Sequence, residues 1–262
     1  MTMTGKGTEP TYPDLVGKVA VVTGGSKGIG AATCRLLAAN GVRVAVVARN
    51  QEGIDALVDT ITRGGGDAMG ISADCSTFAG AEAARQTVEA KFGPTDILVA
   101  FAGGFGSYTP AHEIQEDEWQ DVINSNLTST FLTVKSFLPG MIARRRGVLV
   151  TMASNAGRYL DIPLTASYAA AKAGIVMFTR HIALEVGQYG IRANCVAPAT
   201  TLSERIERIM TPERVKTVSA MSPLGRLGLP EDTALATLYL VSDSAGWITG
   251  ITIDVTGGRV ML

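Results

Sequence analysis

Seven short apolar runs recur along the chain, separated by longer stretches of helical period. From residue 18 onward the runs are rich in Val and Ile, whereas the stretches between them carry Ala and Leu at helical spacing. Several runs are apolar at successive positions, which is typical of strands that helices cover on both faces. The runs lie at residues 19–22, 42–48, 68–73, 97–101, 147–152, 192–196 and 251–255. This alternation predicts an α/β fold with a doubly wound, seven-stranded parallel sheet.

A single domain accounts for this pattern. No linker, tandem repeat or low-complexity segment divides the chain. The first seventeen residues mix Thr, Gly, Pro and charged side chains, without the apolar run of a secretory signal. We therefore expect residues 1–14 to form a mobile N-terminal tail and residues 15–262 to form one domain.

Composition narrows the possible partners. Lys and Arg number 23 against 24 Asp and Glu, so no strong field attracts nucleic acid or an acidic membrane. No window reaches the roughly 18 consecutive apolar residues of a membrane helix. Cys34, Cys75 and Cys195 lack paired spacing, which suits reduced thiols in a cytoplasmic protein. His112 and His181 are isolated from other metal ligands, so we expect no metal site.

A glycine-rich turn links the first apolar run to a helix expected over residues 31–39. Gly24, Gly28 and Gly30 permit a tight turn, a close approach of the backbone to a pyrophosphate, and close packing of helix on strand. The N-terminus of the helix adds unpaired N–H donors and a favourable dipole. The spacing differs from the G-x-G-x-x-G fingerprint, but the strand-to-helix junction predicts dinucleotide binding.

The end of the second run carries a cation where an acid often holds the ribose 2′-hydroxyl of NAD. Arg49 at this point would pair with a 2′-phosphate, and Lys27 in the glycine turn adds a second positive charge. We therefore favour NADP(H) over NAD(H). In the alternative, both cations are solvated and Asn50 or Glu52 contacts the ribose. Asp74, which ends the third run, is placed to accept a hydrogen bond from the adenine amino group.

Tyr168 and Lys172 are four residues apart in an Ala-rich segment and lie on one face of the expected helix. A phenol with a pKa of ~10 is a poor base at neutral pH. A cation ~4 Å away, at an effective dielectric of ~20, supplies roughly the 4 kcal/mol that brings this pKa to about 7. Lys172 can therefore make Tyr168 competent in proton transfer; in the alternative, the pair lies on a helix surface without a role.

Two further polar residues are candidates for the same site. Ser154 follows the fifth run, where its hydroxyl can stabilise charge on a substrate oxygen or simply cap a turn. Asn126 interrupts a helical pattern, which predicts a kink or a polar role, with Asn124 as the competing choice. Residues 103–110 and 199–221 break the alternation and are candidate pocket walls and lid, or ordinary surface loops.

Together these motifs resemble the short-chain dehydrogenase/reductase family, in a single-domain form similar to 3-oxoacyl-[acyl-carrier-protein] reductases. The resemblance covers about residues 15–258. The matching elements are Thr23-Gly24-x-x-x-Gly28-x-Gly30, Asp74, Ala102-Gly103, Asn126, Ser154, Tyr168-x-x-x-Lys172 and Asn194-x-x-x-Pro198. The family implies a Rossmann-like sheet in the order 3-2-1-4-5-6-7, hydride transfer between a nicotinamide cofactor and a ketone or secondary alcohol, and a homotetramer or dimer.

The resemblance also implies a role for each matching residue. Tyr168 would exchange a proton with the substrate oxygen, and Ser154 would position that oxygen. Lys172 would bind the nicotinamide ribose and lower the pKa of Tyr168, and Asn126 would hold a water that links Lys172 to solvent. The expected cofactor contacts are Gly24, Ser26, Lys27, Gly28, Ile29, Gly30, Arg49, Asp74, Cys75, Ala102, Gly103, Tyr168, Lys172, Pro198, Ala199, Thr201 and Ser203.

Three features depart from the family pattern. Ala100 and Phe101 stand where two Asn residues usually brace the sheet. Ala199 replaces the glycine that usually follows Pro198, which changes the local backbone if that glycine needs a positive φ. Ser203 keeps the hydroxyl of the usual Thr.

Other functions fit the sequence less well. A serine hydrolase using Ser154 would need a G-x-S-x-G elbow, which residues 152–156 lack. An enoyl reductase of the family would space its Tyr and Lys more widely. A non-catalytic redox sensor or structural partner that binds a dinucleotide is the alternative to an enzyme.

The resemblance implies a small carbonyl compound or alcohol as the substrate. The side chains expected near the pocket are Phe105, Tyr108, Arg158, Tyr159 and Leu160. They predict a partly aromatic pocket, in which Arg158 either meets an anionic group of the substrate or is solvated.

Overall fold

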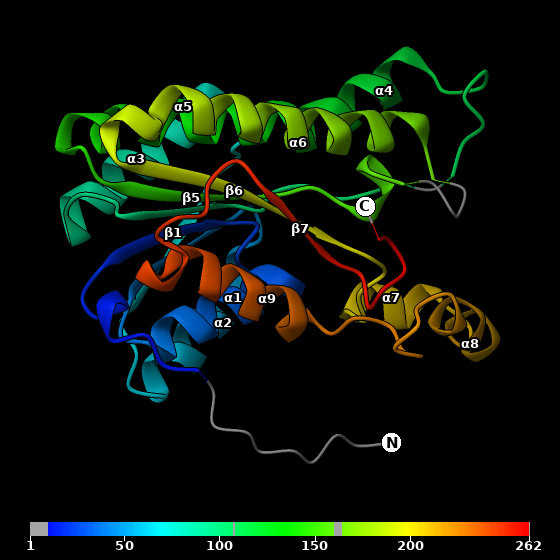
Figure 1. Cartoon of the computed structure of the whole chain (residues 1–262), viewed down its shortest axis with the longest axis horizontal. Coiled ribbons are helices and arrows are strands. Elements are labelled where there is room, and N and C mark those ends of the chain that lie inside the picture. The colour runs from blue at the N-terminus through cyan, green and yellow to red at the C-terminus, as the bar shows by residue number, and fades with distance from the viewer. Residues whose placement is uncertain (1–9, 107, 160–163, 262) are drawn as a thin grey trace.

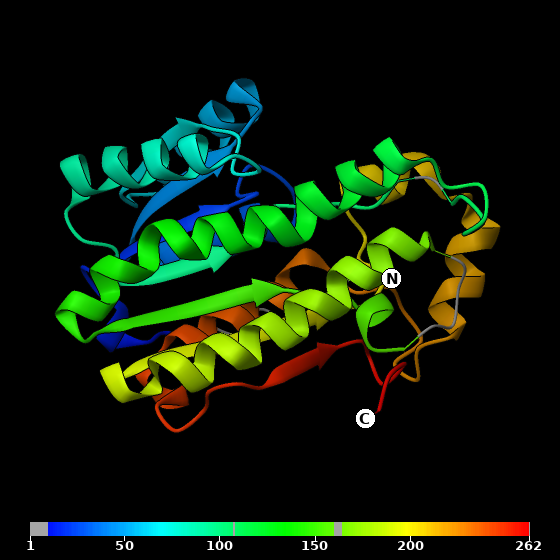
Figure 2. The same cartoon turned by 90° about the horizontal axis from the view of Figure 1, so that it is seen from above.

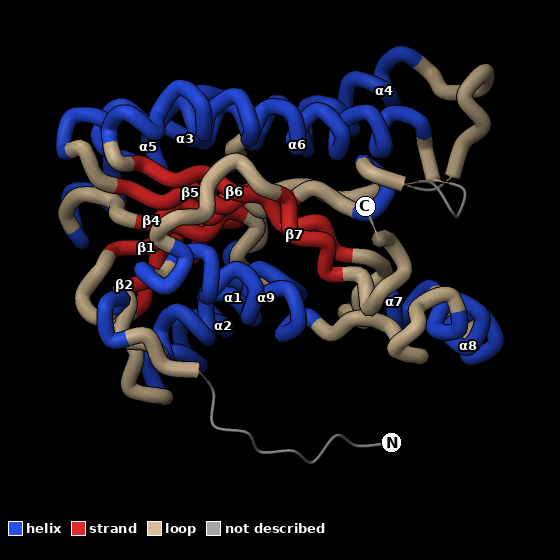
Figure 3. The backbone as a smooth tube through the Cα atoms, in the orientation of Figure 1, coloured by secondary structure: helices blue, strands red, loops and turns tan. Residues whose placement is uncertain are grey.

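The computed structural model describes residues 10–106, 108–159 and 164–261, and a seven-stranded sheet lies at the centre of the molecule (Figure 3). The strands are β1 (Val19–Thr23), β2 (Arg43–Ala48), β3 (Ala68–Ser72), β4 (Ile97–Ala100), β5 (Gly147–Met152), β6 (Ile191–Pro198) and β7 (Thr252–Val255). Their order is β3-β2-β1-β4-β5-β6-β7, and every neighbouring pair is parallel. The predicted fold class and strand order are confirmed.

Helices cover both faces of the sheet (Figure 1). One face carries α1 (Gly28–Ala39), α2 (Gln51–Arg63) and α9 (Pro230–Val241), and the other carries α3 (Phe78–Phe92), α5 (Ser129–Arg144) and α6 (Ala166–Val186). The short helices α4 (Glu116–Ile123), α7 (Glu204–Ile209) and α8 (Pro212–Ala220) lie at one end of the molecule (Figures 1 and 2). No helix within the described ranges is both long and apolar enough to cross a membrane.

The two-sided burial of the strands explains their continuous apolar runs. Successive side chains of a strand point to opposite faces. Val22 of β1 therefore packs with Leu37 of α1 and Leu238 of α9 on one face. Its neighbour Val21 packs with Met141 of α5 on the other face.

The observed strand bounds agree with the predicted ones to within one residue, except at β6. This strand runs on to Pro198, because its last residues pair with β7: Ala197 lies opposite Asp254, and Pro198 opposite Val255. A proline at the end of a strand breaks no following ladder bond. β6 thus extends directly to the segment expected to contact the nicotinamide.

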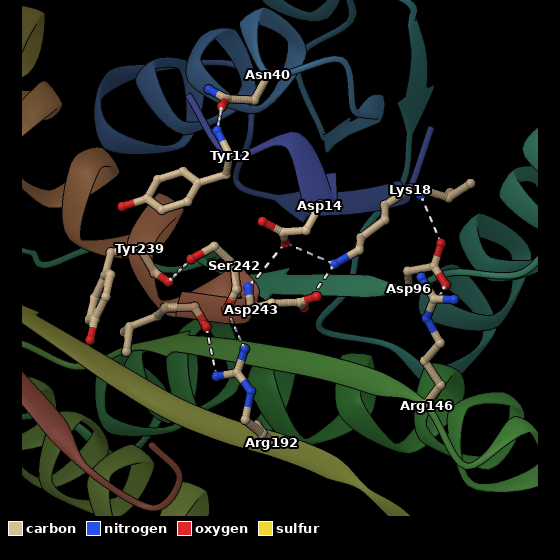
Figure 4. Close-up of polar contacts among 12 residues, drawn as sticks. Tyr12, Asp14, Lys18, Asn40, Asp96, Arg146, Arg192, Tyr239, Ser242 and Asp243 are labelled. Carbon is tan, nitrogen blue, oxygen red and sulfur yellow. Dashed lines mark hydrogen bonds and ion pairs between the residues drawn. The ribbon is translucent and has the colours of Figure 1, made fainter. Parts of the chain in front are cut away.

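Part of the N-terminal segment is bound to the body of the protein. The 3-10 helix η1 (Pro13–Leu15) buries Leu15 completely. Tyr12 N donates a hydrogen bond of 2.8 Å to Asn40 Oδ1, and Asp14 pairs with Lys18 at 3.2 Å (Figure 4). Residues 12–14, which we expect to belong to a mobile tail, thus contact the body of the protein in this structure. Residues 1–9 lie outside the described residues.

The amino ends of the strands carry a network of polar contacts that holds α9 (Figure 4). The Arg192 guanidinium donates to Leu240 O at 2.8 Å, to Ser242 O at 2.9 Å and to Ile248 O at 3.3 Å. The carbonyl groups at the end of a helix lack partners within the helix. Arg192 therefore caps α9 and ties it to the strand β6.

We expect Arg192→Met to destabilise the protein by about 2 kcal/mol, because three partly buried carbonyl groups lose their donor. Urea unfolding should show a lower midpoint with an unchanged slope. Arg63→Met is the matched control, since Arg63 lies exposed on α2 with one surface ion pair. Equal midpoints for wild type and Arg192→Met would contradict the capping role.

Candidate active site

A cavity of about 990 Å³ lies at the carboxyl ends of β1 to β4, where a doubly wound sheet binds its ligands. The expected cofactor residues that line it are Gly24, Ser26, Lys27, Arg49, Asp74, Cys75, Ala102 and Gly103. The opposite wall comes from α4 and the turn after it, including Asp121, Val122 and Ser125. No motif in the sequence predicted this wall.

The glycine turn has a shape that only glycine permits. Gly24 has a φ of +66°, and a Cβ atom on Gly30 would lie 2.2 Å from Gly24 O. Lys27 begins α1 as its N-cap residue without a capping side chain, so the first N–H groups of the helix face the turn without a side-chain acceptor from this residue. This combination of a close backbone cradle and a helix N-terminus fits a pyrophosphate.

The cations expected at the 2′-position lie on one side of the cavity. Lys27 and Arg49 both line it, and Lys27 Cε lies 3.6 Å from the position that a Cβ on Gly53 would take. Asn50 also lines the cavity, but its Oδ1 accepts a hydrogen bond of 2.6 Å from Gly53 N and thereby caps α2. The side-chain oxygen of Asn50 is therefore already engaged.

Asp74 lies at the same end of the sheet, after β3. Its Oδ1 accepts hydrogen bonds from Ser76 Oγ at 2.7 Å and Ser76 N at 2.9 Å, and these bonds lower the pKa of the carboxyl. The nearby charge of Arg49 lowers this pKa further. Asp74 is therefore an ionised acceptor in the cavity wall.

Thr23 braces the junction of β1 and β4. Ala100 and Phe101 at this junction stand where the family usually has Asn side chains. Its Oγ1 accepts hydrogen bonds of 3.2 Å from both Phe101 N and Ala102 N. The side chain of a neighbouring strand thus holds the backbone that carries Ala102 and Gly103.

A π-helical turn, η2 (Asn124–Thr128), turns Asn126 inward. Its buried side chain accepts a hydrogen bond from Gly104 N at 3.1 Å and donates to Gly104 O and Val122 O at 2.9 Å. Asn124 is exposed. The structure therefore places Asn126, and not Asn124, against the loop after β4.

Tyr168 and Lys172 project from the first turns of α6 into the same buried region. Lys172 Nζ donates to Met152 O at 3.0 Å and lies 5.6 Å from the centroid of the Tyr168 ring. A Cβ on Gly103 would lie 3.5 Å from Lys172 Nζ, so this region adjoins the cavity. Burial lowers the pKa of Lys172 to about 8.

Ser154 lies between β5 and the 3-10 helix η3 (Asn155–Gly157). Its buried hydroxyl accepts a hydrogen bond of 3.2 Å from Ala156 N and donates one of 3.3 Å to Asn155 Oδ1. Gly157 presses η3 against α6, because a Cβ there would lie 2.5 Å from Lys172 C. Ser154, Tyr168 and Lys172 therefore come from adjoining segments.

Phe105, a side chain that we expect near the pocket, contacts both α6 and the segment that contains α7 and α8. Its ring meets Tyr168 edge-on, with centroids 6.0 Å apart. It also packs against a cluster that contains Ile206 of α7, Val218 of α8 and Leu227. Phe105 thus brings the loop after β4 into contact with α7 and α8 beside Tyr168, and this contact depends on tertiary structure that no local pattern reveals.

Apart from Tyr168 and Lys172, the remaining expected cofactor residues do not line the cavity of about 990 Å³. Ser203 caps α7 and lines smaller cavities with Lys27 and Gly28. Thr201 Oγ1 donates to Ala199 O at 3.0 Å. Ala199 has no positive φ, so its replacement of the usual glycine causes no backbone strain. The residues in this group are Gly28, Ile29, Gly30, Pro198, Ala199, Thr201 and Ser203.

Both expectations for Arg158 are wrong. Its guanidinium forms a bidentate ion pair with Asp254 of β7, and its side chain is largely buried. The partner is 96 residues away along the chain, so no local pattern predicts the pair. Tyr108 and Tyr159 are exposed, and Leu160 lies outside the described residues.

Comparison with known proteins identifies the family. The family model described as short chain dehydrogenase matches residues 18–213. The chain belongs to the short chain dehydrogenase family. It is 36% identical over 249 residues to a 3-oxoacyl-[acyl-carrier-protein] reductase of Vibrio cholerae, across 95% of this chain and 100% of the relative.

Two further proteins similar to this short chain dehydrogenase carry names that imply different substrates. A 3β-hydroxysteroid dehydrogenase 1 of Eggerthella lenta is 36% identical over 252 residues, across 95% of this chain and 96% of the relative. A 3-oxoacyl-[acyl-carrier protein] reductase from Brucella melitensis, solved with bound NAD, has a TM-score of 0.90 and 30% identity, across 100% of this chain and 99% of that one. The chain is an NAD(P)-dependent oxidoreductase that acts on CH–OH or ketone groups.

We expect Lys172→Met to be more stable than wild type at pH 7, because it removes a buried ammonium. The fall in the Lys172 pKa from 10.5 to about 8 corresponds to about 3 kcal/mol. Between these two values the unfolded chain holds the proton and the folded protein does not, so wild type gains stability relative to the variant as pH rises. Urea unfolding without cofactor, from about pH 7 to pH 10.5, measures this difference.

Lys135→Met is the control, since Lys135 lies exposed on α5. Its difference from wild type should vary little over the window. A difference between wild type and Lys172→Met that stays constant with pH would contradict the burial argument.

Proposed function

We propose that this protein transfers a hydride between NADP(H) and a ketone or secondary alcohol, with Tyr168 as the general acid and base. The observation that carries the proposal is the buried Lys172, whose Nζ lies beside the Tyr168 ring and pairs with no carboxylate among the described residues. A buried ammonium is costly to hold, and a phenolate is a partner that it would stabilise.

The side chains divide the proton chemistry among them. In reduction, Tyr168 would give its phenol proton to the substrate oxygen, and in oxidation it would take that proton back. Ser154 donates only a long bond of 3.3 Å, so its hydrogen can turn to the same oxygen. Lys172 would stabilise the phenolate, and Asn126 would hold the backbone of the loop after β4 beside it. The nicotinamide, when bound, supplies or accepts the hydride.

The cavity residues support NADP(H) as the preferred cofactor. The glycine turn and the N-terminus of α1 would hold the pyrophosphate, and Asp74 would accept from the adenine amino group. Lys27 and Arg49 would meet the 2′-phosphate, since both line the same wall. Asn50 is the less favoured contact because it caps α2.

We expect NADPH to bind more tightly than NADH, and Arg49→Asp to reverse this order. Loss of one charge-assisted contact and the gain of a repulsive carboxylate should weaken NADPH binding by about tenfold to a hundredfold. Fluorescence titration with both cofactors measures the affinities. Arg63→Asp makes the same charge change on the exposed end of α2 and should leave the preference intact. An unchanged preference in Arg49→Asp would remove Arg49 from the proposal.

We expect Tyr168→Phe to lose about 10²- to 10⁴-fold in kcat/KM with a ketone and alcohol panel, while cofactor binding is retained. Nicotinamide absorbance follows the turnover. Tyr239→Phe on α9, at the far side of the sheet from α6, is the control (Figure 4). Retained turnover in Tyr168→Phe would refute the acid and base assignment. Cofactor binding without turnover of any panel member by wild type would favour the redox sensor.

The described surface also supports a homo-oligomer, a dimer or tetramer, of a cytoplasmic enzyme. Phe131 of α5 and both Met177 and Leu184 of α6 are exposed on the outer face of the sheet's helix layer. Exposed apolar side chains on helices that cover the same face of the sheet favour an interface there. All three cysteines are buried, and burial raises the pKa of Cys75 to about 11, which suits unreactive thiols in a reducing compartment.

A further inference from the structure

A bidentate ion pair between Arg158 and Asp254 lies next to η3, the 3-10 helix that follows Ser154. Neither residue has a part in the proposed proton transfer. Arg158 Nε lies 2.6 Å from Asp254 Oδ1, and Arg158 Nη2 lies 2.9 Å from Asp254 Oδ2. The two side chains are only 13% and 15% exposed. Two parallel short bonds between planar groups fix the mutual direction as well as the distance.

The pair joins two segments that each carry one side of the site. Arg158 directly follows η3, the turn whose N-cap residue is Ser154. Asp254 lies in β7, next to Val255, and Val255 O accepts a hydrogen bond of 3.2 Å from Ala199 N. The ion pair therefore ties the turn that carries Ser154 to the strand that holds the segment after Pro198.

Few other contacts fix the direction of the Ser154 hydroxyl. Its own hydrogen bonds, to Ala156 N and Asn155 Oδ1, are long at 3.2 and 3.3 Å and stay within the turn. Gly157 packs the turn against the backbone of α6 at Lys172. Because glycine has no side chain, this contact limits how closely the turn can approach α6 but does not prevent the turn from rotating. The bidentate pair holds the opposite end of the turn.

We propose that Arg158 and Asp254 are positioning residues, which hold Ser154 in register with Tyr168 and Lys172 by fixing the turn between α6 and β7. This inference rests on the proposed function. A largely buried ion pair adds little net stability compared with apolar side chains of similar volume, whereas its geometry is specific. The pair also neutralises Arg158, so a substrate carboxylate gains no partner from it.

The test compares Arg158→Met, Asp254→Leu and the double variant with wild type. We expect kcat to fall on the order of tenfold to a hundredfold in each single variant, because a misplaced group costs that much. The KM for NADPH should stay within about twofold, since no cofactor contact is removed. The double variant should be no slower than the worse single variant, because the two residues act as one unit.

Two further variants separate positioning from mere folding. Arg158→Lys retains one charge contact and should recover part of the kcat lost in Arg158→Met. Arg85→Met is the matched control: Arg85 is a similarly shielded arginine that pairs with Glu82 and Glu89 within α3, away from the site. Its kcat should match wild type.

Hydrogen exchange tests the positioning role without relying on enzyme activity. The amide of Ala156 donates to Ser154 Oγ, so its hydrogen exchange reports on the turn. Exchange at this amide should accelerate at least about tenfold in Arg158→Met and not in Arg85→Met. If wild type turns over no ketone or alcohol, the proposed function fails, and accelerated exchange alone still supports the positioning role.

The inference is overturned by unchanged Ala156 exchange. It is equally overturned if kcat per cofactor-binding site equals that of wild type while the unfolding midpoint falls, since the pair would then serve stability alone.

Discussion

The side chain of Lys172 is buried, and the groups around it must accommodate an ammonium that is shielded from water. Its hydrogen bond to Met152 O ties the second turn of α6 to the end of β5, and desolvation lowers its pKa to about 8. A protein tolerates such a charge only where polar groups and a suitable partner surround it. The Tyr168 ring and the loop held by Asn126 lie beside this ammonium, and η3 packs against the backbone of the same residue.

The parallel sheet makes that convergence possible. Because all seven strands run in the same direction, the residues that follow β1, β4, β5 and β6 meet at a single edge. The glycine turn, the brace from Thr23, Ser154 and Pro198 are far apart in sequence but share this edge. Both faces are covered by helices, so the edge is the place where polar side chains and backbone groups remain available.

The sequence predicted what depends on local periodicity and motif spacing. Uninterrupted apolar runs determine the strands, and the four-residue spacing of Tyr168 and Lys172 places both on one face of α6. The choice between Asn124 and Asn126 needed the π-helical turn, which rotates the helix face by an amount that residue types do not specify. Two contacts depend on segments that only the folded chain brings together. They are the ion pair of Arg158 with Asp254 and the packing of Phe105 against α7 and α8.

The cations at the amino ends of the strands differ in their partners from those at the carboxyl ends. At the amino ends, Lys18 lies between Asp14 and Asp243, and Arg192 is saturated by backbone carbonyls, so these cations serve folding. At the carboxyl ends, Lys27 and Lys172 form no ion pair with a carboxylate of the described residues, although each lies where a counter-charge would be favourable. Arg158 at the carboxyl ends is paired with Asp254, whereas Lys27 and Lys172 there remain available to an anionic group. The proposed binding of a dinucleotide phosphate and the proposed phenolate of Tyr168 would therefore share one electrostatic cause.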